Sequence, residues 1–298
     1  MTDYLIVLNK DEDTVSFVDE TTTQVVKTVA VDRNPHEVAV TPDGRKAFIS
    51  NAGGNTLSVF DMGNLEIIDT ITHPEFNFPH EAKVTPDGQL VLASTYANKV
   101  FLIDTASHAV TKVIPAQRMS HMVALTPDGK LAYISNIGAN SFSVLDMNTE
   151  EWLAHYPVGR SPEGIAVSPD GEWVYVANQD DNLVYIIDTA THSLRARVRT
   201  AAVPIRVAFS PDGRYAFVPN REGDCLTVIE TVHQREIKRI PTGIWPGGTV
   251  FNAAGDKAYV ANNKTNDISV IDVAALKVAG TIDVGIHPDG MAFCRVLD

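Results

Sequence analysis

Short apolar runs of four to eight residues alternate with polar turns along the whole chain, and no stretch shows a helical period. A representative stretch contains four such runs, at 164–167, 173–178, 183–188 and 193–198. They are rich in Val, Ile and Tyr, and turns with Gly, Pro, Asn or Asp separate them. This pattern predicts four short β-strands.

The same unit returns along the chain at nearly constant spacing. Its marker is a Thr/Ser-Pro-Asp-Gly turn, with a degenerate last copy, and the turn glycines are Gly44, Gly88, Gly129, Gly171, Gly213 and Gly255. Proline suits the first corner of such a turn, and glycine accepts a backbone conformation that costs other residues more. Four strands per unit, repeated about seven times, are typical of a β-propeller.

The two ends of the chain complement each other. The C-terminal end supplies only one inner strand, expected at 290–297, whereas the N-terminal end supplies three strands, expected at 4–9, 14–19 and 24–29. Together they would make one composite blade that closes the ring and leaves no open sheet edge. We therefore predict an all-β, seven-bladed propeller of four-stranded antiparallel blades that forms a single domain over residues 1–298.

Several segments resemble those of the YVTN-repeat family of seven-bladed propellers. The resemblance rests on 175–178 and 259–262, which read Tyr-Val-Ala-Asn, and on 57–61 and 268–272, which read Leu/Ile-Ser-Val-Phe/Ile-Asp. It covers essentially the full chain and implies the same fold. It implies no single function, because that family is associated with surface-layer and adhesion-like proteins, redox-associated periplasmic proteins, DNA-binding proteins and lactonase-like enzymes.

Composition narrows the classes of partner. With 24 basic and 37 acidic residues, the chain has a formal charge of −13, which disfavours nucleic acid and anionic membranes as partners. No segment has the apolar length of a membrane span, and the N-terminus lacks a secretory-signal pattern. Cys225 and Cys294 form no CxxC motif. We expect a cytoplasmic protein, or a periplasmic or secreted one if a signal has been removed; the oligomeric state stays open.

The copies differ most at the second position of each unit, after a starting residue that is Ser120 in the third unit and proline in the other six. There the seven units carry His36, His80, His121, Glu163, Ile205, Gly247 and Asp289. Because the first strand of each propeller blade lines the central channel, equivalent positions gather around one mouth. Three imidazoles and a carboxylate suit Fe, Mn, Zn or Cu. We predict a metal site at His36, His80 and His121, with Glu163 as the fourth ligand or general base.

A purely structural interpretation of these histidines is an alternative, since a histidine at this position can hydrogen-bond a neighbouring loop. Glu37 and Glu81 follow two of the histidines and could orient ligands, although we expect their side chains to point between blades. His108 and His192 lie in outer turns, where we expect solvated surface residues.

Other side chains are expected at the same mouth. We assign Arg160 and Arg206, with Glu163, to catalysis, and we assign a substrate-binding role to Arg118, Arg221, Trp245, Phe78, Tyr96 and His287. Arginine favours carboxylate and phosphate groups, so these residues predict a small, anionic substrate. Ion pairs between blades would use the same arginines equally well.

Three functions remain open. The first is a metal-dependent enzyme with lyase, hydrolase or oxygenase chemistry on a small organic substrate. The second is a non-enzymatic scaffold that binds protein or polymer. The third is a lactonase-like hydrolase, although the sequence offers no clear Glu/Asn/Asp set for calcium. No glycine-rich phosphate loop or GxSxG motif is present.

Overall fold

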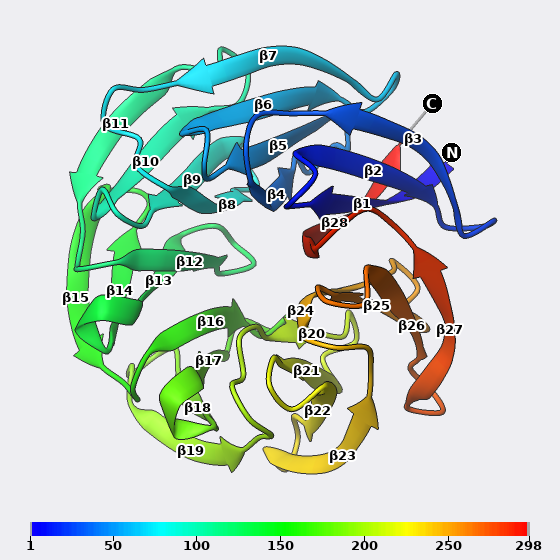
Figure 1. Cartoon of the computed structure of the whole chain (residues 1–298). Helices are drawn as coiled ribbons and strands as arrows, with labels where there is room; N and C mark the ends of the chain where they lie inside the picture. The colour runs from blue at the N-terminus through cyan, green and yellow to red at the C-terminus, as the bar shows by residue number, and fades with distance from the viewer. Residues whose placement is uncertain (1, 297–298) are drawn as a thin grey trace.

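The chain forms seven four-stranded antiparallel sheets arranged as blades around a central axis (Figure 1). The structure is a computed structural model that describes residues 2–296. Blade 1 contains β4 (Pro35–Val40), β5 (Lys46–Asn51), β6 (Thr56–Asp61) and β7 (Glu66–Thr72). Blade 2 contains β8 (Pro79–Val84), β9 (Gln89–Ser94), β10 (Lys99–Asp104) and β11 (Val110–Pro115).

The next four blades repeat this order. Blade 3 contains β12 (Ser120–Leu125), β13 (Leu131–Asn136), β14 (Ser141–Asp146) and β15 (Glu151–Pro157). Blade 4 contains β16 (Pro162–Val167), β17 (Trp173–Asn178), β18 (Leu183–Asp188) and β19 (Leu194–Arg199). Blade 5 contains β20 (Ala208–Phe209), β21 (Tyr215–Asn220), β22 (Cys225–Glu230) and β23 (Arg235–Pro241). Blade 6 contains β24 (Pro246–Phe251), β25 (Lys257–Asn262), β26 (Asp267–Asp272) and β27 (Lys277–Asp283).

Blade 7 is the predicted composite of both chain ends. Its order is β28 (Pro288–Val296), β1 (Thr2–Asn9), β2 (Thr14–Asp19) and β3 (Gln24–Ala30). β1 pairs antiparallel with β28, and the two ends of the chain lie side by side in Figure 1. The seven-bladed fold and its closure are confirmed, while the expected last strand residue, Leu297, lies outside the described residues. Within residues 2–296, no helix is long and apolar enough to cross a membrane.

Apolar side chains fill the spaces between neighbouring blades. Between blades 7 and 1, for example, Ile6 and Phe17 pack with Ile49 and Phe60, all fully buried. The rings of Phe17 and Phe60 are 5.5 Å apart. Such burial between sheets is the main stabilising contribution in this fold, so the charged channel can be stable only on this apolar frame.

A hydrogen bond repeated seven times links each blade to the next. An Asn or Asp between the second and third strands adopts a positive φ, and its Oδ1 accepts the backbone N–H of the residue two positions before the channel position of the next blade. The acceptor and donor pairs are Asn55–Phe78, Asn98–Met119, Asn140–Ser161, Asn182–Val203, Asp224–Trp245, Asn266–His287 and Asp13–Asn34, at 2.7–3.0 Å. Asn and Asp tolerate positive φ better than other side chains do. These bonds therefore fix the residue directly before six of the inner strands. In blade 5 the held residue, Val203, precedes an isolated bridge at Pro204, and β20 begins only at Ala208.

The inner strands are irregular just after this point. In blade 1, Pro35 pairs with Asn51 but the next pair is Glu37 with Ser50, so two residues of β4 face one step of β5. Comparable register shifts interrupt the inner strands of blades 2, 3, 4, 6 and 7. A bulge turns two successive side chains toward the same side. The expectation that Glu37 and Glu81 point between blades is wrong, because both line the channel.

The Thr/Ser-Pro-Asp-Gly turns are held by their aspartates. In blade 3, Asp128 Oδ1 accepts from the Thr126 hydroxyl at 2.7 Å and from the Lys130 backbone at 3.1 Å, and these bonds lower the pKa of Asp128 to about 2. The pKa values of Asp43 and Asp212 are lowered by equivalent bonds. Each turn glycine has positive φ, from 68° at Gly44 to 90° at Gly88, as its position in the turn requires.

The bond between blades can be tested at Asn55. Asn55→Gly keeps positive φ accessible but removes the bond to Phe78, and we expect a loss of about 1 kcal/mol in unfolding free energy. Asn55→Ala adds the cost of positive φ for a Cβ residue, so we expect about 2 kcal/mol. Urea unfolding of both variants measures the contribution of the hydrogen bond and the cost of positive φ separately. Equal stability of Asn55→Gly and the natural chain would show that the bond contributes nothing.

The turn aspartates predict a pH dependence. Their folded pKa values lie below the unfolded value of about 4, so their contribution is present above pH 4 and is lost as the pH falls through the folded pKa. We expect the melting temperature to fall between about pH 4 and pH 2. A triple variant with Asn at Asp43, Asp128 and Asp212 should show a shallower fall over the same range. An identical pH profile in that variant would contradict this assignment.

Candidate functional site

Three histidines from successive inner strands meet at the axis. The rings of His36 and His80 have centroids 4.1 Å apart, and the rings of His80 and His121 are stacked at 3.6 Å. His36 is 9% exposed and His80 is 0% exposed. The structure thus brings together the three histidines that the sequence placed at one mouth. Their convergence follows from their equal position in blades 1, 2 and 3.

Possible ligand atoms come from a set that differs partly from the predicted one. One atom each from His36, Glu37 and His80 lies within 4.8 Å of the others. Neither ring nitrogen of His80 has a hydrogen-bond partner among the described residues, and neither does Nδ1 of His36. His121 differs, because its Nδ1 lies 3.0 Å from the Thr95 hydroxyl. A buried cluster of His36, Glu37 and His80 could therefore hold a metal ion.

Burial keeps these imidazoles neutral. It lowers the pKa of His36 to about 3, partly opposed by the nearby Asp289 carboxylate. It also lowers the pKa values of His80 and His121 well below the ordinary value, and neighbouring positive groups lower them further. At neutral pH the rings are uncharged, and the neutral imidazole is the form that binds metals.

Arg206 from blade 5 reaches across the channel to acidic side chains of other blades. It donates to Glu37 of blade 1 and, at 3.1 Å, to Glu163 of blade 4. Asp289 of blade 7 lies 3.8 Å from the same guanidinium, and Arg221 also contacts Glu163, at 3.3 Å. Glu163, the predicted fourth ligand, is thus ion-paired with two arginines.

The carboxylates respond differently to this environment. Burial raises the pKa of Glu37 to about 8, although Arg206 opposes the shift. Burial also opposes ionisation of Asp289, but Lys10, His36 and Arg206 together lower its pKa below its usual range. Lys10 supplies the closest positive group, 3.1 Å from Asp289. Two buried acids at the same axis therefore have opposite tendencies to ionise.

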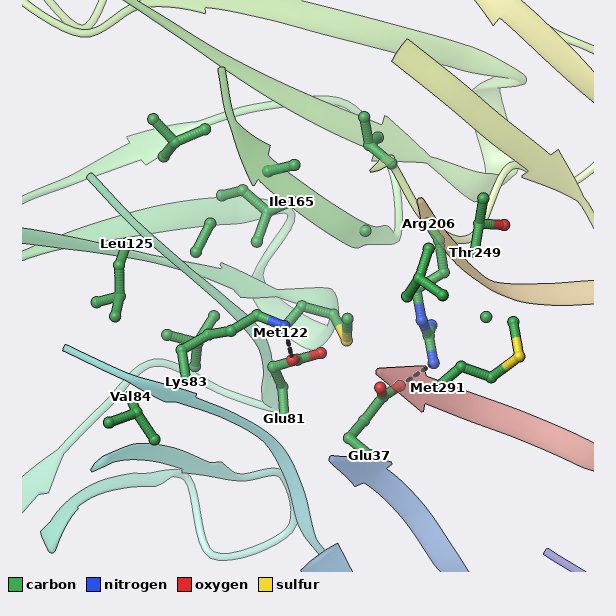
Figure 2. Close-up of a pocket in the computed structure, with 18 residues that line it drawn as sticks. Glu37, Glu81, Lys83, Val84, Met122, Leu125, Ile165, Arg206, Thr249 and Met291 are labelled. Carbon is green, nitrogen blue, oxygen red and sulfur yellow. Dashed lines mark hydrogen bonds and ion pairs between the residues drawn. The ribbon is translucent and has the colours of Figure 1, made fainter. Parts of the chain in front are cut away.

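A cavity of about 340 Å³ lies in the channel next to the cluster (Figure 2). Its charged lining consists of Glu37, Glu81, Lys83 and Arg206. The other walls come largely from the later residues of β8, β12, β16 and β24, which lead to the Thr/Ser-Pro-Asp-Gly turns or their degenerate copy. The cavity thus extends away from the mouth where the sequence analysis placed the substrate.

Of the predicted substrate and catalytic residues, only Arg206 lines this cavity. Phe78 lies over the histidines, with ring centroids 5.7 Å from His36 and 5.9 Å from His80, and it contacts Tyr96 at 4.8 Å. The remaining predicted side chains have other partners: Arg118 with the Gly138 carbonyl, Arg160 with Asp181, Trp245 with Lys264, and His287 with Asp11. Phe78 therefore covers the cluster on its mouth side.

Sequence reasoning missed Lys83 and assigned Glu37 and Glu81 only an orienting role. A signal was present: two residues after the starting position of each unit, the chain has Glu37, Glu81, Met122, Gly164, Arg206, Gly248 and Gly290. A charged residue on such an apolar strand needs an oppositely charged or polar partner when it is buried. The three charged members of this set all line the cavity. In a regular strand, successive side chains point to opposite faces, so this position would be expected to point away from the channel. Only the bulge brings it to the axis.

Two histidines expected on the solvated surface make specific contacts. His108 lies between Asp69, at 2.6 Å, and Lys46, at 2.9 Å. His192 lies 3.2 Å from the Tyr133 hydroxyl and 3.1 Å from the Tyr156 hydroxyl. Both are only partly exposed, so the expectation of solvated residues is wrong; the outer turns of one blade reach the neighbouring sheet.

Removing Arg206 should destabilise the whole fold. Arg206→Met leaves Glu37, Glu163 and Asp289 without their shared partner, and breaking a buried charge network costs about 3–5 kcal/mol. The exposed pair of Arg160 with Asp181 provides a control, so Arg160→Met should leave the urea midpoint unchanged. If both variants unfold at the same urea concentration as the natural chain, the network is not stabilising.

A family model and a curated protein each match part of this chain. Residues 98–209, less than half of the chain, match the family model described as "Lactonase, 7-bladed beta-propeller". Antigen Lp49 of Leptospira interrogans is 26% identical over 113 residues, which are 36% of this chain and 25% of that protein. The match therefore spans a quarter of the length of this curated relative.

Solved structures share the fold at low identity. Hydrazine synthase of Kuenenia stuttgartiensis has a TM-score of 0.84 and 23% identity over 91% of this chain and 92% of that chain. A functionally unknown protein of Desulfotomaculum acetoxidans has a TM-score of 0.87 and 18% identity over 98% and 99%. Dihydro-heme d1 dehydrogenase NirN has a TM-score of 0.73 and 15% identity over 97% and 74%.

These similarities agree with the architecture and assign no activity, because folds of this kind serve many functions. The resemblance to YVTN repeats stays a prediction. The chain is a seven-bladed β-propeller, and a segment running from β10 of blade 2 to the start of blade 5 is similar to the lactonase family.

Proposed function

We propose that this propeller is an enzyme that binds a divalent transition-metal ion through His36, Glu37 and His80 and acts on a small organic molecule in the channel cavity. The observation that carries the proposal is the environment of His80. Its ring is fully buried, and both nitrogens lack a hydrogen-bond partner among the described residues. Leaving such groups unpaired is costly, and a metal ion would satisfy one of them.

The donor set fits this interpretation. Two neutral imidazole nitrogens and one carboxylate oxygen suit Zn, Fe, Mn or Cu. Glu37 uses Oε1 toward Arg206, so its second oxygen is available. With three protein ligands, an ion would keep an open position and could supply Lewis-acid or water-activating chemistry. In this proposal the carboxylate ligand is Glu37 rather than Glu163.

The surrounding side chains have separate roles in the proposal. Arg206 orients the Glu37 carboxylate, and Glu163 holds Arg206 from the other side. His121 packs on His80 and is itself held by Thr95. Phe78 restricts water from the mouth side, so the substrate reaches the cluster through the cavity. Fixed orientation of ligands by neighbours is common in metal sites.

The first reaction to test is hydrolysis of a lactone, because part of the chain matches the lactonase family. Lyase and oxygenase chemistry would also suit an ion of this kind. A second candidate is a binding scaffold, favoured by three exposed apolar side chains on the loops before β24 and β28: Ile244, Trp245 and Ile286, which are 37–50% exposed. A scaffold requires no metal at the axis.

Metal content distinguishes these candidates. Protein produced without a polyhistidine tag should contain close to one transition-metal ion per chain by mass spectrometry, and His80→Ala should contain almost none. His233, an exposed residue paired with Glu230, provides the control, and His233→Ala should keep the metal. Hydrolysis of δ-valerolactone in a pH-stat should follow the metal content.

Absence of metal from the natural chain under varied metal supply would reject the proposal. So would His80→Ala that keeps the metal of the natural chain. Stoichiometric metal without lactone hydrolysis would reject only the hydrolytic reaction and would direct the search to lyase and oxygenase substrates.

A further inference from the structure

The channel cavity contains a lysine with hydrogen-bond donors that its one ionic partner does not use. Its lining includes two basic residues, Lys83 and Arg206. The Arg206 side chain is 9% exposed and is occupied by carboxylates. The Lys83 side chain is 45% exposed, and among the described residues only Glu81 lies within ion-pair distance, at 2.5 Å. An ammonium group has three donors, so Lys83 can accept a further anionic partner.

The wall around this ammonium is apolar. Figure 2 shows Val84, Met122, Leu125 and Ile165 on the side of the cavity where Lys83 lies, and Met291 beside Arg206. Cavities of this kind hold ligands by apolar contact and use a few polar groups to fix orientation. A ligand that fits both parts carries an apolar ring or chain next to one charged group.

Charge balance indicates the sign of that group. Even when all four acidic side chains are ionised, the axis has four carboxylates against four cations, namely Glu37, Glu81, Glu163 and Asp289 against Lys10, Lys83, Arg206 and Arg221. A divalent ion at the histidine cluster would leave an excess of positive charge in a poorly solvated channel. Bound ions dominate local electrostatics, so an anionic ligand would be favoured. This step rests on the proposed function, whereas the free donors of Lys83 do not.

We propose that the cavity binds an amphipathic monoanion, whose carboxylate pairs with Lys83 Nζ while its apolar part lies along Met122, Leu125 and Ile165. Lys83 determines specificity by charge, and Glu81 competes with the ligand for the same ammonium. The mouth arginines take no part in this recognition, because each has a partner within the protein.

Phenylacetate and its neutral analogue phenylacetamide provide probes for isothermal titration calorimetry. The natural chain should bind phenylacetate at least about tenfold more tightly than phenylacetamide, as expected for one charge-assisted hydrogen bond. Lys83→Met should remove this preference. Glu81→Gln keeps the side-chain shape but removes the competing charge, so phenylacetate should bind several-fold more tightly.

Lys112 gives a matched control, since it pairs with Glu150 at 2.9 Å on the outer strand of the same blade as Lys83 but does not line the cavity. Lys112→Met should bind phenylacetate within about twofold of the natural chain. If Lys83→Met fails to fold, the direction of the Glu81→Gln effect decides. Equal binding of the two probes, or unchanged or weaker phenylacetate binding in Glu81→Gln, would overturn the proposal.

Titrations with and without added metal, with metal content measured on each sample, separate this inference from the proposed function. If the chain holds no metal but still prefers phenylacetate through Lys83, only the metal site is rejected. If metal is bound at the histidines and both probes bind equally, only the anion site is rejected.

Discussion

The channel of this propeller depends on one buried guanidinium. Arg206 comes from blade 5 and reaches carboxylates on blades 1, 4 and 7, which are Glu37, Glu163 and Asp289. Glu37, Glu163 and Asp289 need this cation from another blade, because an isolated charge in a poorly solvated interior is very costly. The inner strands therefore share a charge network, while the middle strands of neighbouring blades are held by apolar packing between sheets.

Much of the fold could be predicted because it is repeated. The turn at Thr126–Gly129 has the same physical cause in the first five units, so one interpretation served most of the ring. Convergence of His36, His80 and His121 could be predicted for the same reason, because equal positions in neighbouring blades meet at one axis. Because the unit repeats, a local sequence pattern also predicts contacts between residues far apart in the chain.

The rest of the site could not be predicted by this reasoning. The role of Glu37 depends on a bulge, and the register shift that creates it has no distinct signature in the repeated sequence. The partners of Arg206 lie more than forty residues away in three blades, and no pattern in the chain specifies which acid an arginine meets. Lys83 was missed since it lies farther along the strand, in the part that faces the cavity.

The composite blade has a consequence for the histidine cluster. Asp289 is the second residue of β28, the strand that completes the ring. Lys10 directly follows β1, the strand that pairs with β28. Both ends of the chain therefore contribute to the electrostatics of the axis, which is complete only when the seam between β28 and β1 is formed. A ligand that binds the closed ring more tightly than a ring opened at this seam must stabilise the seam by mass action. Occupancy of the channel and resistance of the chain ends to fraying are therefore thermodynamically linked.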